Sequence, residues 1–203
     1  MENNFSKLYY IMHTISPIVT ERQKQVIMGA ILGGSSVVTP KNGKNCYLSM
    51  RDKRNDWLEF KANELRELSS AAPFTLEKTY RWHSKCYPVF QEFKNMFYKN
   101  EERFLRIDIL SMLSDISFAI WMGDCGSMYE NKLILNTNIW GENNTIILRY
   151  FKLLGYRPKL IKEGIMLDLE GSKDFMNYAT PHLPEWLPLR IKHAILPICN
   201  TVN

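Results

Sequence analysis

The chain lacks the features that mark secreted, zinc-binding and membrane-spanning proteins. Its four cysteines are scattered and form no Cys-x-x-Cys pair, so neither a disulfide framework nor a zinc module is indicated. The N-terminus shows no basic start followed by an apolar block and a small-residue cleavage site, and the apolar stretch Val26–Val38 is too short to span a bilayer. We therefore expect an intracellular protein of the cytoplasm or an organelle matrix, not secreted and without a membrane partner.

A strong charge excess is also lacking. The chain has 26 Lys and Arg against 21 Asp and Glu, and a net charge of +5 fits many proteins that never touch nucleic acid. Residues 1–104 hold 16 basic and 11 acidic side chains, which leaves 10 of each for residues 105–203. The whole excess lies in the first half. Solvated surface charge explains it as well as a nucleic-acid partner does.

Apolar and aromatic side chains, by contrast, are abundant. With 45% hydrophobic residues the chain can bury a core without covalent staples. Hydrophobic periodicity and turn signals predict short alternating elements in the first half. They are a helix over 21–32, strands near 36–39 and 45–51, a helix over 55–68, one strand over 74–83 and a helix over 89–98.

The second half repeats this order of elements. We predict helices over 107–123, 144–154, 172–178 and 187–195, and strands at 132–138, 158–161 and 165–169. Ile27–Ser36 aligns with Phe118–Ser127 at an offset of 91 residues, and Tyr47–Arg51 with Leu133–Thr137 at 86. No linker rich in Pro, Gly or Ser separates the halves. We expect two repeats, 1–104 and 105–203, fused as one rigid unit.

The two aligned segments carry a family resemblance. IMGAILGGSS (27–36) and FAIWMGDCGS (118–127) resemble the two helix motifs of the LAGLIDADG homing-endonuclease family. The segment 80–110 resembles the region that leads into the second motif of single-chain members, so the resemblance covers nearly the whole chain. It implies an α+β fold of two αββαββα-type repeats with pseudo-twofold symmetry, whose saddle-shaped antiparallel sheets are packed by helices. The residues that match the second motif are Ala119, Ile120, Trp121, Asp124, Gly126 and Ser127.

Small residues in both segments fit the packing that the resemblance implies. The two motif helices are expected to contact each other through Met28–Gly33 and Ala119–Gly123. Two glycines inside one apolar helix cost about 1 kcal/mol each relative to alanine, so they suggest a close helix contact. Simple termination of a buried helix by Gly33 and Gly34 explains the stop but not the repeat.

The resemblance further implies that one acidic residue at the end of each motif helix holds divalent metal ions for phosphodiester hydrolysis. The matching positions here are Gly34, which has no side chain, and Cys125, whose soft thiol suits magnesium poorly. Asp124 remains as a metal-ligand candidate, but one helical step turns it about 100° away from that position. We expect no cofactor, and Mg²⁺ only if nuclease activity is retained.

A basic residue near the cleavage centre is also implied. Arg103, Arg190 and Lys192 match it loosely by position, although a lone arginine is most often a surface charge.

Polar side chains alternate along the first predicted strands. Asn45, Tyr47, Ser49 and Arg51 share one face, and a second polar row, Thr75 to His83, follows in the strand predicted over 74–83. The resemblance implies that such rows lie along the major groove of a duplex, whereas in most antiparallel sheets they are simply the solvated side. The predicted nucleic-acid contacts are Lys41, Lys44, Asn45, Tyr47, Ser49, Arg51, Lys53, Arg54, Lys78, Arg81 and His83.

Three functions follow from the sequence. The substitutions at Gly34 and Cys125 favour a monomeric duplex-DNA-binding protein that has lost cleavage. A fully or weakly active, Mg²⁺-dependent, site-specific DNA endonuclease is the second. The third is a maturase-like protein that binds structured intron RNA, for which the same fold needs no aspartates.

Overall fold

The computed structural model describes residues 17–41, 43–69 and 71–187. The chain forms two compact units. The first contains Ser35–Phe97 with the described residues up to Lys24, and the second contains Gln25–Gly34 with the residues from Tyr98 onward. Within the described part, no helix combines the length and apolarity needed to cross a bilayer.

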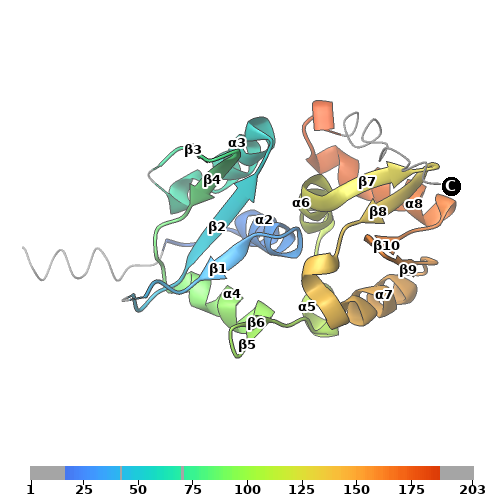
Figure 1. Ribbon diagram of the computed structural model, residues 1–203, viewed down its shortest axis with the longest axis horizontal. Helices are drawn as coiled ribbons and strands as arrows, with labels where there is room; N and C mark the ends of the chain where they lie inside the picture. Colours follow the sequence, from blue (N-terminus) through green and yellow to red (C-terminus); the bar gives the residue numbers. More distant parts are fainter. Residues whose placement is uncertain (1–16, 42, 70, 188–203) are drawn as a thin grey trace, which may run out of the picture. The chain divides into compact units, whose positions relative to one another are not determined.

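The first unit is a four-stranded antiparallel sheet in the order β1-β2-β4-β3, and helix α3 packs against β2 and β4 (Figure 1). Cross-strand pairing sets Ser49 opposite His83 and Arg51 opposite Arg81. Because opposite residues share a face, these four lie on one side and Leu48, Met50 and Trp82, all nearly inaccessible, lie on the helix-covered side. The elements are β1 (Ser36–Val38), β2 (Tyr47–Asp52), α3 (Asn55–Glu64), η1 (Arg66–Leu68), β3 (Phe74–Leu76), β4 (Thr79–His83) and α4 (Val89–Phe97).

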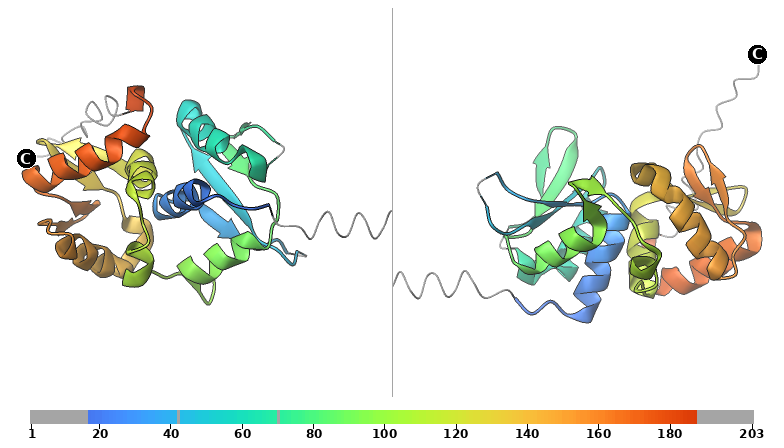
Figure 2. Two further views of the ribbon diagram at one scale, coloured as in Figure 1. Left: turned by 180° about the vertical axis from the view of Figure 1, so that it is seen from behind. Right: turned by 90° about the horizontal axis from the view of Figure 1, so that it is seen from below.

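The second unit repeats this sheet order as β7-β8-β10-β9, with the strands labelled in Figure 1. Figure 2 shows the same unit, coloured yellow to red, from two further sides. Its buried face holds Leu133, Leu135 and Ile165, which pack against α7 and α8. Helix α2 (Glu21–Leu32) begins in the first unit and continues into the second. The other elements are β5 (Tyr98–Lys99), β6 (Glu102–Arg103), α5 (Ile107–Leu110), α6 (Asp115–Cys125), β7 (Gly126–Tyr129), β8 (Lys132–Leu135), η2 (Asn138–Asn143), α7 (Asn144–Leu153), β9 (Lys159–Ile161), β10 (Gly164–Met166), α8 (Leu169–Ala179) and η3 (Thr180–His182).

The α+β class and the two helix-packed antiparallel sheets are therefore confirmed, whereas the single strand predicted over 74–83 is wrong. The segment is a hairpin of β3 and β4, turned at Glu77 with a φ of 57°. Because neither Gly nor Pro marks this turn, the polar and apolar alternation predicted one continuous strand across it. As a consequence, Thr75 pairs with Tyr80 on the helix-covered side, and Phe74 lies opposite Arg81 on the open side.

The structure differs from the prediction at two further places in the second unit. The helix expected over 107–123 is divided into α5 and α6, because Ser114 is extended (φ −105°, ψ 178°) and precedes the first turn of α6. Strand β7, which follows α6 directly, was not predicted. The helix predicted over 187–195 lies almost wholly outside the described residues.

Candidate nuclease centre and nucleic-acid interface

The two motif helices, α2 and α6, touch through glycines. A Cβ atom on Gly29 would lie 2.5 Å from the carbonyl oxygen of Ser117 and 2.8 Å from Cβ of Ile120. A Cβ atom on Gly33 would overlap the side chain of Asp124. No side chain larger than hydrogen fits at either position without movement. The predicted close contact is confirmed at these two glycines.

Gln25 holds the beginning of α6 beside α2. Its side-chain amide donates to the carbonyl of Met112 at 3.0 Å, and its amide oxygen accepts from the backbone N–H of Ser114 at 2.9 Å. The hydroxyl of Ser117 donates to the carbonyl of Gln25 at 3.1 Å. These bonds are buried or partly buried, so they fix the register of the two helices. Sequence reasoning missed Gln25 because a polar residue early in a helix normally indicates a solvated face.

The C-terminal end of α2 is capped by side chains from distant parts of the sequence. Arg103 donates to the carbonyls of Ile31 at 3.1 Å and Gly34 at 3.2 Å, and the indole N–H of Trp140 donates to the carbonyl of Leu32 at 3.0 Å. A helix end carries a partial negative charge, which a guanidinium stabilises. The carbonyl oxygens of Ile31, Leu32 and Gly34 at this end therefore already accept protein donors.

The guanidinium of Arg103 lies close to two aromatic rings. Its guanidinium carbon is 5.3 Å from the ring centre of Trp140 and 5.7 Å from that of Tyr98. Burial lowers the pKa of Arg103 below its usual value, and Tyr98 acts in the opposite direction. Arginine remains charged at neutral pH in any protein environment, so a fixed cation occupies the end of α2. Trp140, which completes this arrangement, was not singled out from the sequence.

Gly34 follows α2 with a φ of +122°, a backbone conformation that residues with a side chain rarely adopt. At the corresponding end of α6, the thiol of Cys125 donates to the carbonyl of Trp121 at 3.3 Å. Asp124 lies against Gly33, at the contact between the helices. Among the residues that the structure describes, no cluster of three or more His, Cys, Asp or Glu side chains could hold a metal ion. These donors do not fit a magnesium ion, which requires several oxygen ligands.

The open face of the first sheet combines cations with stacked rings. The imidazole of His83 lies 5.6 Å from the ring of Phe74 and 5.4 Å from that of Tyr47. Burial lowers the pKa of His83 from 6.5, and the neighbouring Arg81 lowers it further. Arg51 stands directly opposite Arg81. The structure thus brings Tyr47, Arg51, Arg81 and His83 together on one surface, with Ser49 between them.

The remaining predicted contacts are more dispersed. Arg54 precedes α3 and forms two hydrogen bonds with the carboxylate of Asp52, each of 3.0 Å, which offset part of its charge. Asn45 precedes β2 and is partly exposed. Lys192 and Arg190 lie outside the described residues. The predicted lysines that are exposed in turns and loops are Lys41, Lys44, Lys53 and Lys78.

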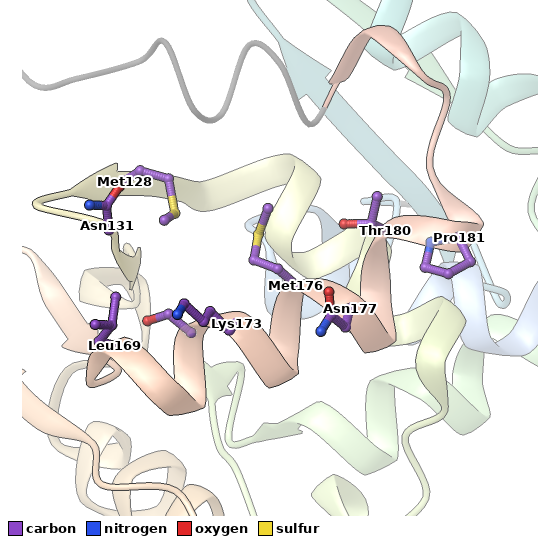
Figure 3. Close-up of a pocket in the computed structure, with 9 residues that line it drawn as sticks. Met128, Asn131, Leu169, Lys173, Met176, Asn177, Thr180 and Pro181 are labelled. Carbon is purple, nitrogen blue, oxygen red and sulfur yellow. The ribbon is translucent and has the colours of Figure 1, made fainter.

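A separate cavity of about 770 Å³ lies between the β7–β8 hairpin and α8 (Figure 3). Its described lining includes Met128, Leu169 and Met176, and its one charged side chain is Lys173. The described lining contains no carboxylate, imidazole or thiol.

Comparison with known proteins agrees with this geometry. The homing endonuclease I-WcaI, solved bound to its DNA recognition sequence, is 18% identical with a TM-score of 0.80, and the match covers 93% of this chain and 94% of that one. I-DmoI, solved with DNA and calcium, is 16% identical with a TM-score of 0.55, covering 84% and 97%. No curated protein sequence matches significantly. Residues 24–164, which include both motif helices and most of both sheets, match the LAGLIDADG DNA endonuclease family, and the chain therefore belongs to that family.

Proposed function

We propose that the chain binds duplex DNA through the open faces of its sheets and does not cleave it with magnesium. The observation that carries the proposal is made at the end of α2. There Gly34 offers no carboxylate, and Arg103 donates hydrogen bonds to the carbonyls of Ile31 and Gly34. Cys125 adds no hard ligand from α6. Hydrolysis by members of this family needs a metal ion held from both helix ends. In this chain neither helix end supplies an acidic side chain at the matching position.

Support for the DNA partner comes from the first sheet. Arg51 and Arg81 are directly opposed across β2 and β4, and like charges in that position destabilise a sheet unless an anion lies between them. The exposed lysines of the first unit, Lys41, Lys44, Lys53 and Lys78, lie in turns and loops next to the strands of this sheet. Two relatives of the same fold, I-WcaI and I-DmoI, were solved with DNA, which makes a duplex the first partner to test.

Structured RNA is the second candidate. Phe74 is 44% exposed and stacks with His83, and exposed aromatic rings are the usual platform for unpaired bases. An A-form duplex hides its base edges in a deep, narrow groove, so an RNA ligand would have to present loops or single strands.

The test is a binding series with the full chain, using a random-sequence DNA duplex library and a structured intron-type RNA at increasing salt. If about six phosphates are contacted, the logarithm of the DNA association constant should fall with a slope of about −5 against the logarithm of salt concentration. Absence of duplex binding at low salt would refute the proposal. Preference for the RNA over the duplex would favour the second candidate.

A further inference from the structure

The two sheets present different chemistry on the faces that lie away from their buried sides. In the first sheet, the central strands β2 and β4 pair Arg51 with Arg81 on the open face. In the second sheet, the central strands β8 and β10 pair Ile134 with Met166 on the face away from the buried Leu135 and Ile165. The topologies are the same, so this difference comes from the side chains alone.

The arginine pair carries the hydrogen-bond donors that a base-reading contact needs. Arg51 is exposed, and Nε of Arg81 is buried with no hydrogen-bond partner among the described residues. Phe74 lies directly opposite Arg81 on β3. A planar guanidinium donates two parallel hydrogen bonds to O6 and N7 of guanine, which are adjacent acceptors in the major groove.

The second sheet offers an apolar surface instead. Ile134 lies on this side of the sheet but is only 4% exposed, whereas its cross-strand neighbour Met166 and Ile161 on the same side are partly exposed. Exposed Lys159 lies opposite Met166 and can contact a phosphate. Apolar side chains in a major groove recognise thymine, because it is the base that carries a 5-methyl group.

We infer that the first sheet reads guanine through Arg51 and Arg81, and that the second sheet reads thymine methyl groups through Met166 supported by Ile134. The inference rests on the proposed function. It requires a target whose two halves differ in composition, one with guanines at the arginine pair and the other with thymines at the methionine.

The experiment begins with selection of a tight duplex from a library randomised over two helical turns, about 20 base pairs. Single guanines are then replaced by 7-deazaguanine, which removes only the N7 acceptor, and single thymines by deoxyuridine, which removes only the methyl group. Loss of a guanine contact should weaken binding about 5- to 100-fold. Loss of a buried methyl should weaken it about 4-fold.

Variants assign each effect to its sheet. In Arg81→Gln the 7-deazaguanine effect should disappear, and in Met166→Gln the deoxyuridine effect should disappear, with each effect confined to its own half of the target. The controls are Arg66→Gln, which removes an exposed charge from η1, and Leu153→Gln, which changes a 68% exposed side chain on α7. Both controls should keep both effects.

Two results would overturn the inference in distinguishable ways. Tight, salt-dependent binding that neither base analogue alters would refute base reading by these residues and leave the proposed function intact. Failure to retain any duplex at low salt would remove the proposed function and the inference together.

Discussion

Restoring the two acidic positions is the perturbation that the structure constrains most closely. Gly34→Asp places a side chain at a φ of +122°, where a residue other than glycine is strained by about 1–3 kcal/mol. Cys125→Asp adds a negative charge at the C-terminus of α6, which costs about 0.3–1 kcal/mol. The double variant should thus lose about 1–4 kcal/mol and melt about 3–15 °C lower than the unaltered chain.

Calcium should reverse this loss in the double variant. An ion bound only by the folded state, at a concentration about 100-fold above its Kd, restores about 2.7 kcal/mol. Each single variant supplies one carboxylate and should recover much less. The assay is thermal unfolding of the four proteins with and without Ca²⁺, accompanied by titration calorimetry.

Gly34→Ala is the matched control for backbone strain. Open space surrounds the added methyl group, since the nearest atom, Cδ1 of Ile139, is 4.0 Å away. This variant should be destabilised like Gly34→Asp but gain nothing from calcium. An unchanged melting temperature for Gly34→Ala would refute the strain argument, and equal calcium stabilisation of the unaltered chain would refute the loss of the metal site.

Three other predictions concern the motif contact, the capped helix end and the open sheet face. Gly29→Ala forces a methyl group against the carbonyl of Ser117, so the free energy of unfolding should fall by about 1–3 kcal/mol, measured by denaturant titration; a gain in stability would show that the helices separate at no cost. Arg103→Met removes two charged hydrogen bonds from the end of α2 and should lower the free energy of unfolding by about 2–3 kcal/mol, whereas an effect within error would show that Arg103 does not stabilise that end. The folded chain holds the pKa of His83 below 6.5, so as pH falls His83 is protonated in the unfolded chain before it is protonated in the folded chain. The contribution of His83 to the free energy of unfolding is therefore fully present above pH 6.5 and is lost as pH falls through the folded pKa. His83→Gln should therefore flatten melting temperature against pH in that window, and an unaltered profile would contradict the assignment.

The order of elements could be predicted from the sequence because hydrophobic period and glycine stops are local signals. Alternation in β2 placed Tyr47, Ser49 and Arg51 on one face, and the strand's burial pattern agrees. The β3–β4 turn was missed because Glu77 adopts a positive φ without being glycine or asparagine. Misreading that one turn placed Thr75 on the wrong face.

The candidate centre depends on contacts that no local pattern encodes. Arg103 was selected by its place before the second motif, but its hydrogen bonds to Ile31 and Gly34 join residues 72 and 69 positions apart. Trp140 reaches Leu32 across 108 positions. Only the packing of α2 beside the second sheet's helices brings these groups together, and a single sequence carries no signal for it.

The central claim, that the chain holds duplex DNA without cutting it, is tested most directly by a cleavage assay under conditions of complete binding. The selected duplex, end-labelled on each strand in turn, is saturated with protein in Mg²⁺ and analysed on a denaturing gel, while binding is verified in parallel. We predict that both strands remain intact while the duplex stays bound. Magnesium-dependent cutting that Asp124→Ala abolishes would contradict the account, because it would show that Asp124 holds the metal and that the chain is a working nuclease.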